Sequence, residues 1–446
     1  MSGPRGGGPP GGKAFRGGEA RSPRALARRV LDRVGEQDAW ATLSLDGELA
    51  RSGLEERDRR LAAELVYGVL RHRLRLDRAL AIHADLRRTP PRLLTALRVA
   101  AYQLLLLDRV PAYAAVDDAV DAARGLGGAK LAGFANAVLR KVGAAGEPPL
   151  PGEARARLLV AASLPGWILD ELAAVIEDPK ELELAALALA EQAPLFVRAN
   201  LRRGSREALV ARFAAEGVTA EPVPDTDAAL RLSNLGDPAQ SAAFGDGLFT
   251  VQDLSAQGVA RAAAPQRGQR VLDACAGVGG KSTHLAELCD DAASVEAADL
   301  SATKLALLRE SAQRLGLHGI HTHVCDLLTP ELPALGRDFS SVILDAPCSG
   351  LGVLRRHPDA KWRVLPAQVE SVAAVQARLL DAVYEVLAPG GTLVYSVCTF
   401  TAREGKQQIG ALLQRRPELQ LVGEQQTWPH RDGGDAFYLA RLVRKH

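Results

Sequence analysis

The chain has 446 residues, of which 47% are hydrophobic and 24% are charged. That length is enough for two or three domains with cores of their own, and the composition excludes a largely disordered protein. The formal net charge of +2 is too small to indicate a nucleic-acid-binding protein by itself. Most basic residues are arginines, which suit bidentate phosphate contacts, although a GC-rich genome would give the same arginine excess with no functional meaning.

The cysteines and the apolar runs indicate the cellular environment. Neither a CxxC pattern nor a Cys/His ligand spacing occurs among the five cysteines, which are Cys275, Cys289, Cys325, Cys348 and Cys398. This argues against a disulfide framework and against a metal site. The N-terminus lacks the apolar core of a signal peptide, and the most apolar run, residues 99–107, is too short to span a bilayer. We therefore expect a cytoplasmic protein with no membrane contact, and the simplest expectation for its oligomeric state is a monomer.

The N-terminal third divides into a tail and a helical region. Residues 1–22 are rich in glycine, proline and basic residues and cannot bury enough apolar surface to fold, so we predict a disordered basic tail. In residues 23–145 the apolar side chains follow a helical period, and Leu26, Val30 and Val34 share one face. Residues 99–107 are apolar all round, as in the central helix of a bundle, which predicts an all-helical domain.

Three segments of this helical region resemble the NusB-like RNA-binding domain: ELVYGVLRHR at residues 64–73, AYQLLLLDRVPAYAAVDDAV at 101–120 and FANAVLRKV at 134–142. They are similar in particular to the version of this domain that is fused to bacterial ribosomal RNA methyltransferases of the RsmB type. The resemblance implies that the domain binds RNA, although Phe134 and Asn136 can equally be core and capping residues.

A proline- and glycine-rich linker, residues 143–152, indicates the next domain boundary. Within residues 150–241 a strand is predicted at 196–200 and a helix at 207–216. We interpret this region as a small α+β module that positions the substrate for the domain that follows.

Strands and helices alternate in residues 242–446, which predicts a Rossmann-like parallel sheet with helices on both faces. A strand at 270–275 leads into a glycine-rich loop at 276–281 and then a helix, an arrangement that lets a backbone approach a ligand closely. Dinucleotide, nucleotide and methyl-donor enzymes all use such a loop. A P-loop is excluded because Cys275 stands where that motif needs a glycine.

Carboxylates at three successive strand ends narrow the choice of ligand. Asp299 lies where a ribose diol would be held, Asp326 suits an adenine amino group, and Asp345 ends the next strand. These groups would be costly to desolvate without a polar ligand. S-adenosylmethionine, which has a ribose, an amino group and a cationic sulfonium, fits this edge better than NAD.

Two of the strands are followed by cysteines. The apolar strand at 342–345 leads through Pro347 to Cys348, and the strand at 392–397 leads to Cys398. One crossover helix fits between them, so both thiols are predicted to lie at the same edge of the sheet.

The motifs DACAGVGGKSTHLAE, DAPCSGLGVLRRHPDAKW and YSVCTF resemble the signature motifs of the Sun-family RNA cytosine-C5 methyltransferases, and VQDLSAQ at residues 251–257 is similar to their entry motif. The resemblance implies a cofactor site formed by Cys275, Ala276, Gly277, Val278, Gly279, Gly280, Lys281, Asp299, Asp326 and Asp345. The family usually has Ala-Pro where Gly277 and Val278 stand. We expect this difference to loosen the loop without abolishing binding.

Cytosine-C5 chemistry needs an activated cysteine. A thiolate that adds to carbon 6 makes carbon 5 nucleophilic, and a second group must then release the product. Asp345 would polarise the cytosine ring by hydrogen bonding. A carboxylate beside Cys348 should raise the pKa of that thiol, so Cys398 is the better nucleophile. The resemblance agrees, because it assigns attack to Cys398 and product release to Cys348.

We expect ribosomal RNA of the small subunit, free or partly assembled, to be the substrate. Its path is predicted to follow the residues Arg355, Arg356, His357, Lys361, Trp362 and Arg363, although these can equally form a solvated charge run. The alternatives are a cytosine-C5 methyltransferase that acts on transfer RNA or on DNA, and a non-catalytic RNA-binding assembly factor.

Overall fold

The computed structural model describes residues 22–37, 39–108, 110–329 and 335–446. These residues form two compact units. The first contains residues 22–70 and 76–148, and the second contains residues 71–75 and 149–446. Apart from Ser22, the predicted basic tail at residues 1–22 lies outside the described residues.

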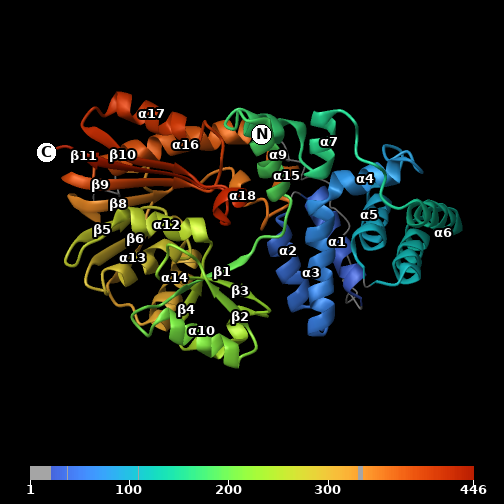
Figure 1. Cartoon of the computed structure of the whole chain (residues 1–446), viewed down its shortest axis with the longest axis horizontal. Helices are drawn as coiled ribbons and strands as arrows, with labels where there is room; N and C mark the ends of the chain where they lie inside the picture. Colours follow the sequence, from blue (N-terminus) through green and yellow to red (C-terminus); the bar gives the residue numbers. More distant parts are fainter. Residues whose placement is uncertain (1–21, 38, 109, 330–334) are drawn as a thin grey trace, which may run out of the picture. The chain divides into compact units, whose positions relative to one another are not determined.

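The first unit is helical (Figure 1). Its helices are α1 (Pro23–Glu36), α2 (Ala41–Ala50), α3 (Glu56–Arg71), α4 (Arg73–Ala81), α5 (Pro91–Leu106) and α6 (Ala112–Ala145), except that the last residue of α3 and the first three of α4 belong to the second unit. Helix α1 begins where the Ser22 hydroxyl accepts a hydrogen bond from the Ala25 N–H at 3.1 Å. Leu26, Val30 and Val34 on this helix are buried, which confirms the predicted apolar face.

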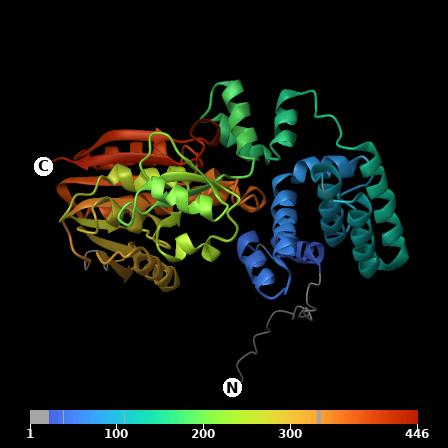
Figure 2. The ribbon, with the colours of Figure 1, turned by 60° about the horizontal axis from the view of Figure 1, so that its bottom comes forward.

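Helix α5 forms the centre of this unit and packs against α1 and α6 (Figure 2). Val99, Ala100, Ala101 and Tyr102 are all buried, as the apolar run predicted. Gly68 on α3 permits a close approach to α5, because a Cβ at this position would lie 2.1 Å from Cζ of Tyr102. The prediction of an all-helical domain is confirmed.

The second unit opens with three short helices and a small sheet. The helices are α7 (Ala154–Ala161), α8 (Gly166–Ala173) and α9 (Pro179–Ala188). The sheet is antiparallel, has the order β2-β3-β1-β4, and consists of β1 (Leu195–Ala199), β2 (Thr219–Pro222), β3 (Ala229–Ser233) and β4 (Phe249–Val251). Helix α10 (Arg206–Ala215) buries Leu209 and Phe213 against the sheet residues Val197 and Phe249.

The strand and the helix predicted in this module are present as β1 and α10. Strand β4, in contrast, lies beyond residue 241, in the segment that was assigned to the next domain. It joins the small sheet because it pairs with β1, where Val197 faces Val251. A three-residue strand gives little periodic signal, so sequence alone did not separate it from the larger sheet.

The large sheet has seven strands in the order β10-β11-β9-β8-β5-β6-β7. Their bounds are β5 (Arg270–Asp273), β6 (Ser294–Asp299), β7 (Ile320–Val324), β8 (Phe339–Asp345), β9 (Leu387–Val397), β10 (Leu419–Gln426) and β11 (Tyr438–Arg444). The pairs from β9 to β7 are parallel, as predicted, but β11 pairs in antiparallel fashion with both β9 and β10, so the sheet is mixed and not wholly parallel. From β5 the chain first adds β6 and β7 on one side and then returns to add β8 and β9 on the other side, so the strand order reverses next to β5. Ligands of open α/β sheets bind at the carboxyl ends of strands at such a point.

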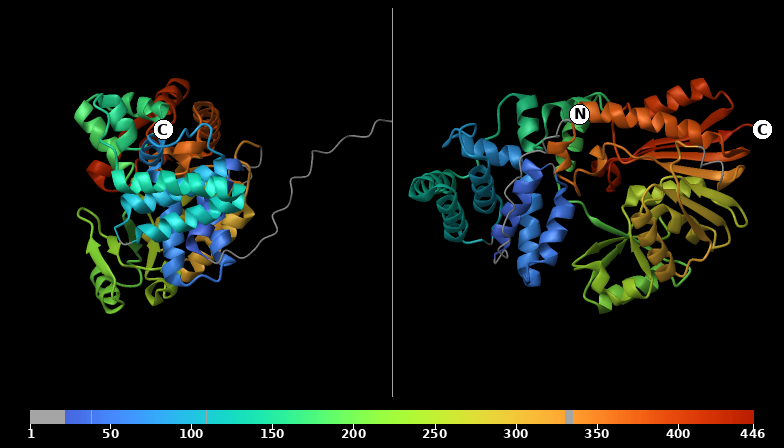
Figure 3. Two further views of the ribbon diagram at one scale, coloured as in Figure 1. Left: turned by 90° about the vertical axis from the view of Figure 1, so that its right-hand side faces the viewer. Right: turned by 180° about the vertical axis from the view of Figure 1, so that it is seen from behind.

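Helices cover both faces of this sheet (Figure 3). On one face, α16 (Pro366–Tyr384) and α17 (Lys406–Arg415) bury Leu380 and Leu412. On the other face lie α12 (Leu254–Ala263), α13 (Gly280–Leu288) and α14 (Ala302–Leu315). The short elements are η1 (Pro238–Gln240), α11 (Ala242–Gly245), η3 (Leu351–Val353), α15 (Ala360–Arg363) and α18 (Pro429–Asp432). The predicted multidomain fold is confirmed. No helix in the described ranges is long and apolar enough to cross a membrane.

Candidate active site

Acidic residues gather at the carboxyl edge of the large sheet. Asp273 ends β5, Asp299 ends β6 and Asp345 ends β8, while Asp326 stands two residues beyond the end of β7. These four strands are neighbours in the order β8-β5-β6-β7, so their ends lie side by side.

The two cysteines meet at the same edge. The Sγ atoms of Cys348 and Cys398 are 3.2 Å apart, and both side chains are partly exposed. The neighbouring strands β8 and β9 hold them there, because the Ala346 N–H donates to the Ser396 carbonyl at 2.9 Å just before the two loops begin. Sequence reasoning predicted this meeting of the two thiols.

Asp345 is held by two hydrogen-bond donors. Lys281 Nζ lies 2.6 Å from Oδ2, and the Ser396 hydroxyl donates to Oδ1 at 2.7 Å. Burial acts to lower the pKa of Lys281, but the Asp345 carboxylate outweighs it and the pKa is raised. The charged pair therefore lies at the edge of the sheet with a fixed orientation.

The pKa of Cys348 is raised well above its usual value. The causes are its hydrogen bond with Cys398, burial, the negative charge that Cys398 can carry, and the carboxylate of Glu404. The sequence argument assigned this effect to Asp345. That residue is turned toward Lys281 and Ser396 instead, so the contributing carboxylate is Glu404.

The glycine-rich loop has the open backbone that a ligand needs. Gly277 has φ +57°, its N–H donates to Asp299 Oδ2 at 3.0 Å, and a Cβ built on it would meet nothing within 4 Å. Gly279 has φ +89°, and a Cβ there would lie 2.4 Å from Cγ of Leu308. Val278, between them, is 54% exposed. The main chain therefore has free space beside it at Gly277, whereas Gly279 packs closely against Leu308 of α14.

The strand before this loop places a protonated thiol and a buried carboxyl group beside it. The pKa of Cys275 is raised by burial and then by Asp273, Asp345 and Asp299, so its thiol is protonated. Burial raises the pKa of Asp273 to about 6, although the Ser282 hydroxyl, which donates to it at 2.6 Å, acts to lower it. Ala276 continues the sheet through its N–H, which donates to the Ala298 carbonyl at 2.9 Å.

A buried arginine of the small sheet binds both ends of helix α13. Arg198 is 1% exposed and donates to both carboxylate oxygens of Glu287, at 2.8 and 3.0 Å. It also donates to the Gly280 carbonyl at 3.1 Å. The α+β module thus fixes the helix that follows the glycine-rich loop, a link that sequence reasoning missed.

The predicted RNA path needs a correction. Arg355 and Lys361 are 3% and 1% exposed, which contradicts their placement on an RNA-contacting surface. Arg355 forms an ion pair with Asp435, which is 1% exposed, and Lys361 donates to the carbonyls of Arg71 and Ala162. Both side chains bind partners inside the fold, because a buried charge is stable only when it is paired or hydrogen-bonded.

The other four residues of that set are partly buried: Arg356, His357, Trp362 and Arg363. Arg356 pairs with Asp253 at 2.8 Å and with Asp435 at 2.6 Å. An RNA contact by these four stays a prediction.

Three further residues near the cysteines were not found from the sequence: Ser396, Gln376 and Glu404. Each is 0% exposed and hydrogen-bonds to the site or to its loops. Ser396 lies within the YSVCTF motif, so it could have been predicted from the sequence. Gln376 and Glu404 lie in a helix and in a turn whose pattern carries no such signal.

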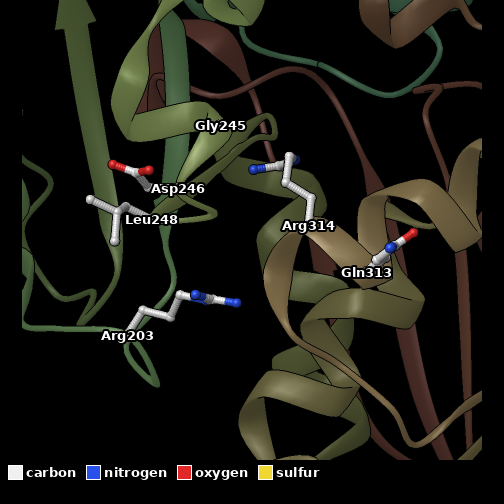
Figure 4. A pocket seen from close by; sticks show the side chains of 6 residues that line it. All are labelled: Arg203, Gly245, Asp246, Leu248, Gln313 and Arg314. Carbon is white, nitrogen blue, oxygen red and sulfur yellow. The ribbon is translucent and has the colours of Figure 1, made fainter.

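A hollow of about 700 Å³ lies elsewhere in the second unit (Figure 4). It is lined by Arg203, Gly245, Asp246, Leu248, Gln313 and Arg314. Arg314 is on the last turn of α14, which leads back to the start of β7, so the hollow is at the edge opposite the cysteines. Its two arginines already donate to the carbonyls of Phe244, Phe249 and Leu315. We therefore assign the active site to the carboxyl edge.

In the described ranges no three His, Cys, Asp or Glu side chains are grouped so that they would hold a metal ion.

Replacing Asp299 by alanine tests the cofactor site. The side chain of Asp299 accepts from the N–H groups of Gly277 and Ser301 and has lone pairs left for ribose hydroxyls. Such charge-assisted bonds are strong, so Asp299→Ala should weaken binding of S-adenosylmethionine by roughly 2 kcal/mol or more in calorimetry. Asp178→Ala is the matched control, because Asp178 caps α9 at the Lys180 N–H, away from this edge. Unchanged affinity in a folded Asp299→Ala variant would contradict the placement of the ribose.

Comparisons with known proteins match each of the three regions of the chain to a protein family. The sequence pattern of the NusB family matches residues 21–144, and a pattern described as the RsmF/B-like ferredoxin-like domain matches residues 164–237. The pattern described as 16S rRNA methyltransferase RsmB/F matches residues 260–443.

Relatives are similar over nearly the whole chain. The probable ribosomal RNA small subunit methyltransferase B of Bacillus subtilis is 32% identical over 95% of this chain and 99% of its own length. The ribosomal RNA small subunit methyltransferase B of Vibrio cholerae is 34% identical over 95% and 98%.

Solved structures share the fold. The crystal structure of a protein named PH0851 covers 94% of this chain and 98% of its own, with a TM-score of 0.79 and 22% identity. NSun6 from Pyrococcus horikoshii, solved with SFG, covers 65% of this chain and 100% of its own, with a TM-score of 0.59 and 21% identity.

Proposed function

Because this chain belongs to the RsmB/F family of 16S rRNA methyltransferases, we propose that it methylates carbon 5 of a cytosine in small-subunit ribosomal RNA through a covalent cysteine adduct. One observation carries this proposal beyond methyl transfer in general. Two thiols lie 3.2 Å apart beside the ion pair of Asp345 and Lys281, at the edge where the cofactor loop ends. A nucleophile, a second acid–base group and a polar clamp are the parts that substitution at carbon 5 needs.

S-adenosylmethionine supplies the methyl group when it is bound. The loop from Cys275 to Lys281 would lie against it, Asp299 would hold the ribose and Asp326 the adenine amino group. The open backbone at Gly277 and the row of carboxylates support this assignment.

Cys398 is the nucleophile in this mechanism. Its thiolate forms a bond to carbon 6 of cytosine, and the electron pair of the C5–C6 double bond becomes available at carbon 5. That pair would form the bond from carbon 5 to the methyl group, and the electron pair of the broken S–CH3 bond would stay on the sulfur of the donor. Asp345, fixed by Lys281 and Ser396, hydrogen-bonds the ring and orients it for the addition. The target base must leave its stack to reach this edge, which favours single-stranded or loop RNA.

Cys348 then acts in the release of the product. While Cys398 is a thiolate, its hydrogen bond and its charge both raise the pKa of Cys348 and keep that thiol protonated. Once Cys398 is bonded to carbon 6, neither its hydrogen bond nor its charge raises the pKa of Cys348 any longer, so Cys348 loses its proton to solvent more readily than before. The Cys348 thiolate takes the proton from carbon 5. The C–H electron pair restores the C5–C6 double bond, and the C6–S pair returns to Cys398.

The substrate is the second part of the proposal. The relatives are named as methyltransferases of small-subunit ribosomal RNA, and the NusB-family region supplies a second RNA-binding domain. Such an enzyme works in the cytoplasm, where ribosomes are assembled.

Methyl transfer from labelled S-adenosylmethionine tests this function. Small-subunit ribosomal RNA should be labelled on a single cytosine, while transfer RNA and duplex DNA should stay unlabelled. Labelling of transfer RNA or DNA instead would show that the proposed substrate is wrong. Tight binding of the donor without labelling of any nucleic acid would favour a non-catalytic assembly factor.

A further inference from the structure

Glu404 is a buried carboxylate that neither the cofactor site nor the two thiols explain. It stands in the turn between β9 and α17 and is 0% exposed. No lysine, arginine or histidine of the described chain forms an ion pair with it. A buried charge without a cation is stable only where hydrogen bonds satisfy it.

The first set of these hydrogen bonds holds the loop of Cys348. The Ser349 N–H donates to Oε1 of Glu404 at 2.7 Å, and the Ser349 hydroxyl donates to Oε2 at 2.6 Å. Gln376 Nε2 donates both to Oε1 at 3.2 Å and to the Pro347 carbonyl at 2.9 Å. The residues on both sides of Cys348 are therefore bound to one network.

The second set holds the loop of Cys398. The Thr401 hydroxyl donates to Oε2 of Glu404 at 2.7 Å. Thr399, directly after Cys398, lies 3.0 Å from the Ser349 hydroxyl and 3.4 Å from Oε2. Tyr395 fixes the main chain, since its hydroxyl donates to the Glu404 carbonyl at 2.6 Å.

We propose that Glu404 is a positioning residue for both cysteines, because it binds the residue that follows each of them and so holds the two sulfur atoms next to each other. This inference rests on the proposed function and adds to it the group that sets the geometry of the thiol pair. Glu404 touches neither substrate nor cofactor and acts only through Ser349, Thr399 and Gln376.

The charge of Glu404 gives this role a second consequence. It contributes to the raised pKa of Cys348, after the hydrogen bond with Cys398, burial and the charge of Cys398. Removal of the charge should therefore make Cys348 easier to ionise, which a purely structural role of Glu404 would not do.

The test uses Glu404→Gln, in which an NH₂ group replaces one acceptor oxygen and the charge is lost. In a Cys398→Ser background, the rate of Cys348 alkylation by iodoacetamide is followed against pH by peptide mass spectrometry. We expect Glu404→Gln to lower the midpoint of this profile by about one pH unit. With Cys398 intact, kcat for RNA methylation should fall by roughly 10- to 100-fold while donor affinity stays unchanged.

Glu424→Gln is the matched control, because Glu424 is an exposed glutamate on β10 that accepts a hydrogen bond from the Tyr438 hydroxyl at 2.6 Å. It should change neither the alkylation profile nor kcat. Ser349→Ala separates geometry from charge. It removes the hydroxyl donor and keeps the carboxylate, so kcat should fall while the alkylation midpoint stays where it is in the parent protein.

The proposal is overturned if Glu404→Gln keeps either the parent midpoint or a kcat within about twofold of the parent value. If Glu404→Gln does not fold, Ser349→Ala takes its place, and a kcat of Ser349→Ala within about twofold of the parent value overturns the proposal. The alkylation assay needs neither RNA nor donor. A parent protein that methylates no RNA would thus refute the proposed function, while the Cys348 profile would still test Glu404.

Discussion

Cys398→Ala is expected to lose methyl transfer by roughly 1000-fold or more, because no other group would form the bond to carbon 6. Cys348→Ala is expected to behave differently. Its Cys398 still attacks and carbon 5 still receives the methyl group, but the proton on carbon 5 has no base to accept it. The protein should therefore accumulate as a covalent adduct with RNA. Denaturing gels of each variant mixed with labelled RNA and S-adenosylmethionine distinguish the two outcomes.

Cys289→Ala is the matched control for both variants. Cys289 is buried at the end of α13, and its Sγ donates to the Leu285 carbonyl at 3.0 Å, away from the carboxyl edge of the sheet. This variant should methylate RNA at the parent rate and accumulate no covalent adduct with RNA. An adduct that forms with Cys398→Ala and not with Cys348→Ala would reverse the roles of the two thiols.

Arg198→Met is expected to lower the free energy of unfolding by about 3–5 kcal/mol, since it leaves a buried carboxylate without its partner. The Arg198 and Glu287 side chains are 1% and 8% exposed and form two hydrogen bonds with each other. Urea unfolding, followed by tryptophan fluorescence and circular dichroism, measures the change.

The same small sheet supplies the control for this prediction. Arg231 pairs with Glu221 at 2.6 Å, but the two side chains are 54% and 56% exposed. Water screens such a pair, so Arg231→Met should cost less than about 1 kcal/mol. Equal effects of the two substitutions would contradict the account of Arg198 as a buried support of the cofactor loop.

The parts of the site that follow from strand direction could be predicted from the sequence. Parallel strands bring their carboxyl ends to one edge, so Asp299, Asp345, Cys348 and Cys398 could be placed together once their strands had been recognised. The helical domain was equally accessible, because its apolar faces repeat with the helical period.

Contacts between distant segments could not be predicted in this way. Arg355 pairs with Asp435, which is 80 residues further along the chain, so a run of charges that looked exposed in the sequence is partly buried. Glu404 reaches Ser349 only through the turn between β9 and α17. The raised pKa of Cys348 was predicted with the right direction but from the wrong carboxylate, because the sequence does not show which way Asp345 points.

The measurement that tests the central claim most directly uses RNA whose cytidines carry tritium at carbon 5. Substitution at this carbon expels the hydrogen, so the account predicts one tritium released to water for each methyl group transferred to small-subunit ribosomal RNA. Cys398→Ala should show neither event. Methyl transfer to the RNA without tritium release would contradict attack at carbon 5 and, with it, the roles proposed for both cysteines.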